Sequence, residues 1–492
     1  MRLHRGGQTF KEWHWWHGPP WSRRNGEIAS AIAAKNASRS PATDRLIFIT
    51  IILCLCLAAC ENVATTQPIQ EESRVGRQRN DAIAITNVTL IDVASGARQT
   101  AMTVLTKAGQ ISNVGRALSV PEGTARVDGT GKFLIPGLWD MHAHHQATGR
   151  DSLDLYLANG VVGTRDMGSD VEFILPLRDR IDRGELLGPE IVAAGPILDD
   201  APPDWPFRRR VSNAQDAREA VRDLKRHGVD FIKVHDHTPR DAYFAIADEA
   251  RKVGLPFAGH VPIGVTVEEA ADSGIKSIEH LANFRVFRDC SGNEPYSPVR
   301  CRSLFERLAA RGVWETPTIT FSKLIPDLFV GKPLPHVEFA SDSLLELIRK
   351  NAEASNLDEE GLAFFRSNSR TSLVAIRDLF ASGNHFLAGC DGLVPGFCLH
   401  DELEEMTRAG LSPLQAIQTA TINPAKFLGR EKMQGTIEIG KRADLVLLEA
   451  DPLTDISNTR RIDSVMVRGQ LFLRPQVDRI IAAHRAHPRT RK

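Results

Sequence analysis

The segment FLIPGLWDMHAHH at residues 133–145 decides the fold, because it joins a continuous apolar run to histidines at the end of that run. A run that is apolar at nearly every position is typical of a strand buried on both faces, as in a parallel sheet. His142 and His144 end the run, and side chains two positions apart on a strand point to the same side. The segment therefore predicts a buried strand that presents two imidazoles at its carboxyl end.

Similar short apolar runs recur along the chain, with helical patterns between them. Thr266 and Glu269, for example, have the spacing of a capping box that begins a helix. Repeated strand–helix units predict an α/β fold, a TIM-type (β/α)8 barrel. A doubly wound sheet is the alternative, but no Gly-rich dinucleotide-binding motif follows the first run. The eight runs lie at 133–141, 161–166, 191–195, 231–234, 257–259, 276–278, 313–318 and 385–389.

Two β-rich pieces flank this central region, and a long interval interrupts it. Alternating apolar residues occur near both ends of the chain, and neither piece has enough strands to bury a face alone. We therefore expect residues 81–134 and 430–473 to form one small β-sandwich, with the barrel at 135–429. The interval at 320–384 has room for a helical insertion over the barrel mouth.

Side chains that bind metals lie at the carboxyl ends of several runs. In a TIM-type barrel these ends meet on the face that carries the active site. Each residue alone has an ordinary structural explanation, but their joint position favours a metal site built from imidazoles and a carboxylate. Besides His142 and His144, the candidates are Lys233 in FIKV, His260 after FAG, His280 after SIE and Asp391 after FLAGC.

Lys233 is the most informative of these residues, because it interrupts an apolar strand. A buried ammonium group costs several kcal/mol unless it is paired. It either pairs with a carboxylate such as Asp236 or Asp166, or CO2 has converted its amine into an anionic carbamate that bridges two cations. We favour the carbamate, because the surrounding histidines are metal ligands and not anions.

These motifs resemble the amidohydrolase superfamily, specifically its imidazolonepropionase-like and prolidase-like metal-dependent hydrolases. The resemblance implies two divalent ions, with His142 and His144 at the first and His260 and His280 at the second. It also implies that carbamylated Lys233 bridges both ions, and that Asp391 binds the first ion and moves protons. The matching segments are FLIPGLWDMHAH (133–144), GVVGTRDMG (160–168), FIKVHD (231–236), AGHVP (258–262), SIEHL (277–281), GCDG (389–392) and most of 420–453.

The resemblance also implies an enzyme that cleaves amide C–N bonds with a metal-bridging hydroxide. Small amides such as dipeptides or N-acyl amino acids are the expected substrates, and histidine-rich ligation favours zinc. A mononuclear deaminase or cyclic-amide hydrolase is the alternative, disfavoured by Lys233 and by the sequence VPIGV after His260. A non-catalytic binding lipoprotein is a third possibility, disfavoured because every expected ligand is present.

Two further residues are candidate substrate contacts. Relatives often have a tyrosine two positions after the bridging lysine, whereas this chain has His235, which either contacts the substrate or competes as a metal ligand. Arg165 stands at the end of the second run, where it either receives a substrate carboxylate or pairs with Asp166 or Asp140.

The N-terminal region predicts export. Residues 46–59 are apolar, follow Arg45 and end at Cys60, as in a lipoprotein signal peptide at 45–60 whose cysteine is lipidated. This predicts a periplasmic or outer-membrane-anchored lipoprotein that contacts membrane only through its lipid. An uncleaved signal anchor or a buried strand is the alternative. We expect residues 1–44 to be an unstructured upstream extension and 61–80 a linker.

Charge and cysteine content add two expectations. The 61 Lys and Arg residues balance 61 Asp and Glu residues, but the positive excess lies at the ends, including a basic tail at 474–492. The acidic body argues against a nucleic-acid partner. Export places Cys290, Cys301, Cys390 and Cys398 in an oxidising compartment, where three pairings are possible. We favour Cys290 with Cys301 across a short polar loop, which leaves Cys390 with Cys398.

Overall fold

The computed structural model describes residues 82–200, 207–292, 294–354 and 358–485. The expected upstream extension, the signal peptide with Cys60 and the linker therefore lie outside the described residues. None of the described helices has the length and apolar character that a bilayer-spanning segment needs.

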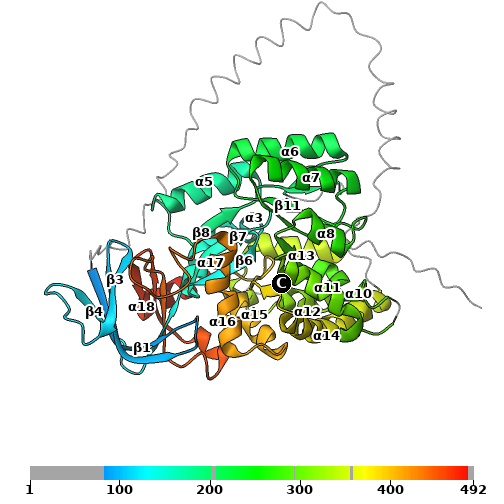
Figure 1. Cartoon of the computed structure of the whole chain (residues 1–492). Coiled ribbons are helices and arrows are strands. Elements are labelled where there is room, and N and C mark those ends of the chain that lie inside the picture. Colours follow the sequence, from blue (N-terminus) through cyan, green and yellow to red (C-terminus); the bar gives the residue numbers. More distant parts are fainter. Residues whose placement is uncertain (1–81, 201–206, 293, 355–357, 486–492) are drawn as a thin grey trace, which may run out of the picture. The chain divides into compact units, whose positions relative to one another are not determined.

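One mixed sheet joins the two β-rich flanks of the chain, seen in Figure 1 as blue and red strands that lie side by side. Strand β5 pairs antiparallel with β16, and this pairing connects the N-terminal strands to the C-terminal ones. The sheet contains β1 (Ala82–Ile91), β2 (Arg98–Lys107), β3 (Gln110–Arg116), β4 (Ala125–Asp128), β5 (Phe133–Pro136), β16 (Leu445–Leu448), β17 (Ile462–Val467) and β18 (Gln470–Leu473).

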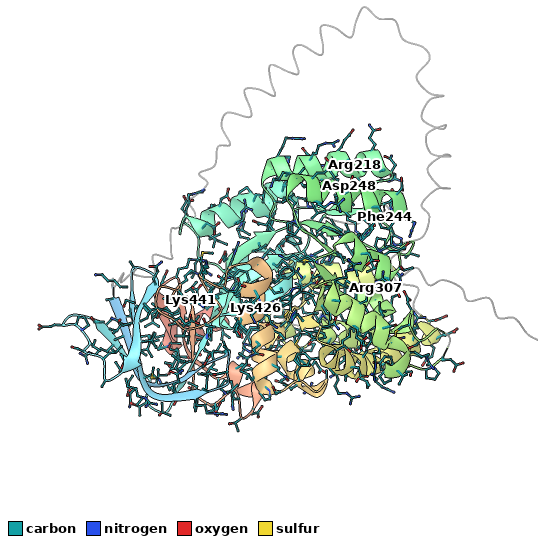
Figure 2. All side chains as sticks on the ribbon, viewed as in Figure 1. Arg218, Phe244, Asp248, Arg307, Lys426 and Lys441 are labelled. Carbon is teal, nitrogen blue, oxygen red and sulfur yellow. A yellow bond between two sulfur atoms is a disulfide. The ribbon has the colours of Figure 1, made fainter. Side chains whose placement is uncertain are left out.

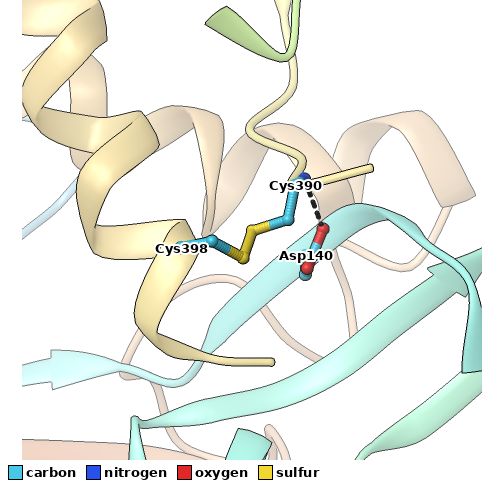
Figure 3. A group of neighbouring side chains, drawn as sticks. All are labelled: Asp140, Cys390 and Cys398. Atoms are coloured by element: carbon cyan, nitrogen blue, oxygen red, sulfur yellow. Dashed lines mark hydrogen bonds between the residues drawn. A yellow bond between two sulfur atoms is a disulfide. The ribbon is translucent and has the colours of Figure 1, made fainter. Parts of the chain in front are cut away.

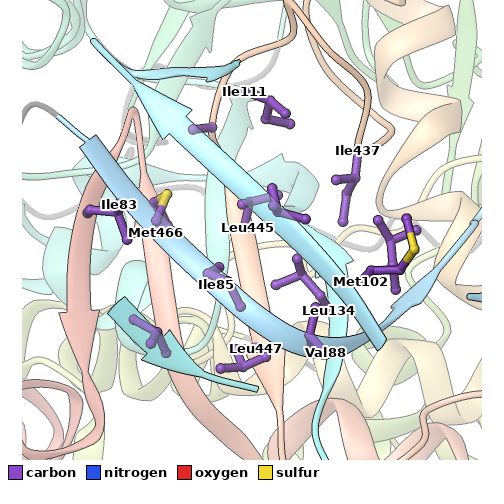
Figure 4. Packing of buried hydrophobic residues seen from close by; sticks show 14 residues of the cluster. Ile83, Ile85, Val88, Met102, Ile111, Leu134, Ile437, Leu445, Leu447 and Met466 are labelled. Carbon is purple, nitrogen blue, oxygen red and sulfur yellow. The ribbon is translucent and has the colours of Figure 1, made fainter. Parts of the chain in front are cut away.

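The sequence predicts a β-sandwich, which has two facing sheets. In the described residues these eight strands form a single sheet. The sheet curls, because Ile111 at its β3 edge bonds to the segment before β16. Its N–H donates to Lys441 O and its carbonyl accepts from Gly440 N, both at 2.8 Å. The curl encloses the apolar cluster in Figure 4, in which alternate residues such as Ile83 and Ile85, or Leu445 and Leu447, point inward.

All eight apolar runs contain strand residues, and the strands from β6 to β15 pair in parallel. They form two groups in the order β6-β7-β8 and β10-β9-β11-β12-β13-β14-β15. Their bounds are β6 (Leu138–Ala143), β7 (Val161–Asp166), β8 (Glu190–Ala193), β9 (Ile197–Asp199), β10 (Arg208–Arg210), β11 (Ile232–Val234), β12 (Phe257–Gly259), β13 (Ser277–Glu279), β14 (Trp314–Thr316) and β15 (His385–Phe386).

Backbone hydrogen bonds connect both edge strands of the three-stranded group, β8 and β6, to the seven-stranded group. Asp230 N donates to Ala193 O at 2.8 Å, which links the segment before β11 to β8. Met141 N donates to Ala388 O at 2.8 Å, which links β6 to the segment after β15. The strands and the helices outside them give an α/β barrel-type fold.

The helices follow the expected local signals. Thr266 Oγ1 accepts from Glu269 N at 3.1 Å and Glu269 Oε2 accepts from Thr266 N at 3.0 Å, which completes the capping box. The helices between the strands are α5 (Val171–Asp182), α6 (Ala214–His227), α7 (Arg240–Val253), α8 (Val267–Ser273) and α11 (Pro298–Ala310), with the shorter α3 (His145–Thr148), α4 (Leu153–Ala158), α9 (His280–Asn283) and α10 (Arg285–Arg288).

The long interval is helical, as the sequence predicts, with α12 (Ile319–Phe329), α13 (Asp342–Ala354) and α14 (Glu359–Ala381). The remaining helices are α15 (Phe397–Arg408), α16 (Pro413–Thr419), α17 (Ile422–Leu428) and α18 (Arg474–His484), the last from the expected basic tail. Outer helix faces carry half-buried ion pairs, such as the 2.5 Å contact of Arg218 on α6 with Asp248 on α7, labelled in Figure 2. Pairs of this kind contribute little to stability.

Candidate metal centre

The candidate ligands meet around the carboxylate of Asp391. Its Oδ1 lies 3.3 Å from His142 Nε2 and 3.2 Å from His144 Nε2, and its Oδ2 lies 3.6 Å from His280 Nε2. The rings of His280 and His260 are in contact edge to face, with centroids 4.8 Å apart. The structure thus brings together all five predicted imidazole and carboxylate ligands at the carboxyl ends of parallel strands.

Each of these four histidines bonds to the protein through Nδ1 and directs Nε2 elsewhere. Metal-binding histidines commonly use one ring nitrogen in this way, which fixes the tautomer and leaves the other nitrogen for the metal. The Nδ1 partners are Glu279 Oε2 for His142 (2.8 Å), Gly168 O for His144 (3.3 Å), Asp236 Oδ1 for His260 (3.0 Å) and Thr318 Oγ1 for His280 (2.6 Å).

The residues present fit a divalent metal ion. His142 Nε2 is buried and has no hydrogen-bond partner in the described structure, although it points at the Asp391 carboxylate. His142, His144 and Asp391 offer ligand atoms that all lie within 4.8 Å of one another. Imidazole nitrogens with one carboxylate oxygen are a donor set that suits zinc.

A second group with the same spacing contains His235, Asp236 and His260. The His235 ring is stacked on that of His260, with centroids 3.8 Å apart. The four candidate histidine ligands have Nδ1 partners, whereas His235 has a buried Nδ1 without a hydrogen-bond partner in the described structure. His235 therefore lies in the candidate centre, next to the second expected ion position.

The electrostatics favour neutral rings at His260 and His280 and an ionised carboxylate at Asp391, the forms that metal ligation requires. Burial lowers the pKa of His280 well below its ordinary value. Burial also lowers the pKa of His260, although Asp236 opposes this shift. Burial alone raises the pKa of Asp391, but His280 and His142 outweigh it and hold that pKa well below its usual range.

Lys233 is buried in β11 with a relative exposure of 1%. Neither carboxylate considered as its partner pairs with it: Asp236 accepts hydrogen bonds from His260 and Asn283, and Asp166 accepts one from His145 N. Burial lowers the pKa of Lys233 to about 8, against the opposing effect of Glu279 and Asp391. The lowered pKa increases the fraction of the neutral amine, which is the form that reacts with CO2.

Arg165 lies inside the fold, with a relative exposure of 1%, and every guanidinium nitrogen is engaged. It donates to Met141 O at 2.7 Å, to Ser277 Oγ at 2.8 Å and to Glu279 Oε1 at 2.9 Å. Its carboxylate partner is thus Glu279, and neither Asp166 nor Asp140 pairs with it. This geometry favours a structural role for Arg165 over contact with a substrate.

Sequence reasoning did not single out Glu279 or the part that Asp236 plays. Glu279 stands between Arg165 and His142, and Asp236 orients His260. Glu279, like Lys233, is a charged residue inside a short buried strand. That pattern could have identified it from the sequence. Its two partners come from other strands, however, and local spacing does not reveal them.

Three residues that follow strands β13, β14 and β15 have left-handed backbone conformations. His280 has a φ of 55°, Thr318 of 44° and Asp391 of 56°. Residues without glycine's freedom adopt this region at an energetic cost and often do so at functional sites. The turn after His280 brings Asn283 Nδ2 to 2.9 Å from both oxygens of Asp236, which supports the carboxylate that orients His260.

The four described cysteines form two disulfides, Cys290–Cys301 and Cys390–Cys398, which are the pairings the sequence favours. Asp140, Cys390 and Cys398 also have the spacing of a metal site. Because their sulfurs are bonded to each other, this third group offers no thiolate to a cation (Figure 3).

Comparison with known proteins places these features in a family. A model of the amidohydrolase family matches residues 133–472. An adenine deaminase of Methanococcoides burtonii is 22% identical over 361 residues, which are 70% of this chain and 51% of that protein. The chain thus spans about half, or less, of the length of the first curated relatives that it matches.

Two solved structures show the same fold. A Xaa-Pro dipeptidase with bound methionine in its active site has a TM-score of 0.63 and 22% identity, over 80% of this chain and 100% of that one. A bottromycin amidohydrolase has a TM-score of 0.66 and 23% identity, over 84% of this chain and 92% of that one.

Proposed function

Because the chain belongs to the amidohydrolase family, we propose that it is a metal-dependent hydrolase of amide C–N bonds. The observation that carries the proposal is the shared orientation of His142, His144, His260 and His280. Each is fixed through Nδ1, and three of the four Nε2 atoms lie within 3.6 Å of one carboxylate.

The donor positions support a centre of two divalent ions, most simply zinc. His142, His144 and Asp391 would hold the first ion, His260 and His280 would hold the second, and Lys233, if carbamylated, would supply the anion between them. Such ions lower the pKa of water and polarise a carbonyl group. The buried amine of Lys233, which forms no ion pair within the described residues, supports the carbamate, because a bridging anion removes the cost of a buried ammonium.

The chain itself supplies proton transfer. Asp391 is ionised and lies at the middle of the centre, so it can accept a proton from the attacking nucleophile and pass it to the leaving amine. His235 lies beside His260 and is available to contact the substrate.

We propose small amides, such as dipeptides or N-acyl amino acids, as the substrate class. The likeness in fold to a Xaa-Pro dipeptidase is compatible with this class. The second candidate is deamination, because three of the curated relatives are adenine deaminases. Lys233 favours the binuclear hydrolase, since a bridging anion is needed only where two cations lie close together.

The test is a metal analysis of the purified protein, followed by assays on dipeptides, N-acyl amino acids and adenine. We expect about two zinc ions per chain and release of a free amino acid. One ion per chain together with release of ammonia from adenine contradicts the proposal in favour of the deaminase. A protein that binds no divalent metal contradicts both.

Closure of the barrel and export of the protein are also proposed. We propose that the strands close into a full TIM-type barrel, since hydrogen bonds join the two groups at both sides. We also propose that the protein is exported and anchored through lipidated Cys60, because residues 46–59 have the composition of a signal-peptide core.

A further inference from the structure

The regular strand ends well before Asp391, although Leu387 N still donates to Glu315 O at 2.9 Å and Ala388 N to Thr419 O at 3.0 Å. Strand β15 contains only His385–Phe386, and residues 387–390 follow it without regular secondary structure. Asp391 itself has a φ of 56°, in the left-handed region that non-glycine residues rarely adopt. Since its carboxylate occupies the middle of the candidate centre, contacts outside the strand must fix this backbone.

One set of contacts comes from β6. His142 O accepts from Asp391 N at 2.7 Å and from Cys390 N at 3.2 Å. The buried carboxylate oxygen Oδ1 of Asp140 accepts from Cys390 N and from His142 N, both at 3.1 Å. Gly389 permits this approach, because a Cβ at that position would lie 2.6 Å from His142 Cβ. Asp140 thus connects the backbones of two candidate ligand segments (Figure 3).

The other contact is covalent. Cys390, the residue before Asp391, is bonded to Cys398 in the first turn of α15, and both are buried. Figure 3 shows the disulfide running from the helix to the segment that Asp140 holds. Helix α15 is itself firmly held, since Glu402 accepts from Ile319 N at 2.9 Å and from Thr320 N at 2.8 Å.

We propose that the Cys390–Cys398 disulfide is a positioning element for Asp391. It ties the residue before Asp391 to α15 and, together with Asp140, keeps the Asp391 carboxylate near His142 Nε2 and His144 Nε2. The inference rests on the proposed metal centre and goes beyond it, because it assigns a role in metal retention to a disulfide that contains no ligand.

The second disulfide provides a matched control. Cys290–Cys301 spans a sequence separation of 11, against 8 for Cys390–Cys398, so the two restrict the unfolded chain to a similar extent. Cys290 Sγ contacts carbonyl oxygens of its own helical turn, and neither Cys290 nor Cys301 adjoins a candidate ligand in sequence. A general loss of chain restraint therefore affects both pairs, whereas loss of Asp391 positioning affects only one.

The experiment compares Cys390→Ser/Cys398→Ser with Cys290→Ser/Cys301→Ser after both proteins have been loaded with zinc. Zinc release to an excess of a chromogenic chelator is followed with time, and thermal unfolding checks the fold of each. We expect release from the first variant to be about tenfold faster than from wild type, and release from the second to change less than about twofold. Equal release rates in the two variants overturn the inference. A wild-type protein that binds no zinc overturns the metal centre, and the inference with it.

A measurement on protein that is already folded covers the case in which the first variant does not fold. In Cys290→Ser/Cys301→Ser protein loaded with zinc, a phosphine reduces Cys390–Cys398. The phosphine takes the oxygen of one water molecule to become its oxide, and the disulfide gains two electrons and that water's two protons, which mass spectrometry counts as two thiols. We expect the same acceleration of zinc release; an unchanged rate in protein shown to carry both thiols overturns the inference.

Discussion

Glu279 joins Arg165 to His142 inside the fold: its Oε1 accepts from Arg165 Nη2 at 2.9 Å, and its Oε2 lies 2.8 Å from His142 Nδ1. All three side chains are buried. Burial alone raises the pKa of Glu279, but Arg165 and His142 outweigh it and keep that pKa low. The carboxylate therefore remains ionised and holds the His142 ring in one tautomer.

Glu279→Gln is expected to weaken metal binding about 10- to 100-fold while preserving most of the fold. The amide keeps an acceptor for His142 but loses the charge opposite Arg165. Isothermal titration of the metal-free protein with zinc measures the change, and Glu122→Gln at an exposed position is the control. Unchanged zinc affinity contradicts the positioning role of Glu279.

His142→Ala, His144→Ala and Asp391→Asn are each expected to lower kcat by orders of magnitude. Tm should change little for His144→Ala and Asp391→Asn, but should fall for His142→Ala, which removes a buried ring and the partner of Glu279. His227→Ala on the exposed face of α6 is the matched control and should retain activity. Near wild-type kcat with full metal content in any of the three variants contradicts that residue's assignment as a ligand. Global unfolding instead indicates a structural role.

Lys233→Ala is expected to lower bound metal from about two ions per chain to one or fewer and to abolish activity, because two close dications need an anionic bridge. Acetate or propionate should restore part of the activity by occupying the vacated space. Metal analysis and assays with and without these acids measure both effects, with exposed Lys225→Ala as the control. A Lys233→Ala protein that keeps its metal and its rate contradicts the carbamate.

The C-terminal helix is expected to make a pH-dependent contribution to stability. His484 Nε2 lies 2.6 Å from Asp154 Oδ1, and this hydrogen bond raises the pKa of His484. Because the folded pKa exceeds the unfolded one, the stabilisation is complete below the unfolded value near about 6.5 and is lost as pH rises through the folded pKa. The contribution is at most about 1 kcal/mol, since the pair is partly exposed.

Denaturant unfolding of His484→Gln tests this expectation. The variant should be less stable than wild type at about pH 5.5 and nearly equal to it at about pH 9. Asp154→Asn should remove the same pH-dependent contribution to the free energy of unfolding. A difference that is independent of pH contradicts the proposed origin in the His484 charge.

Membrane association is expected to depend on Cys60. Expression with the natural N-terminus should yield a blocked terminus and a membrane-bound protein, and Cys60→Ser should release it to the soluble fraction, because lipidation requires that thiol. Fractionation and mass spectrometry of the N-terminal peptide measure this. Recovery of Cys60→Ser in the membrane fraction favours an uncleaved anchor.

The sequence predicted features that depend on neighbouring residues. The eight strand positions, the capping box at Thr266 and the pair of imidazoles at His142 and His144 all follow from short-range spacing. The curl of the β sheet depends on contacts between Ile111 and Lys441, which no local pattern reports. In the same way, Arg165 meets Glu279 across the interior, and only the assembled strands bring the two together.

The pairing of β5 with β16 has a consequence for the order of folding during synthesis. Ile135 finds its partner Val446 only after the entire barrel has been translated. Until then the edge of β5 presents unpaired backbone groups, and such edges promote association with other chains. The N-terminal strands therefore depend on late, long-range contacts, and we expect truncation before residue 445 to cause aggregation of nascent chains.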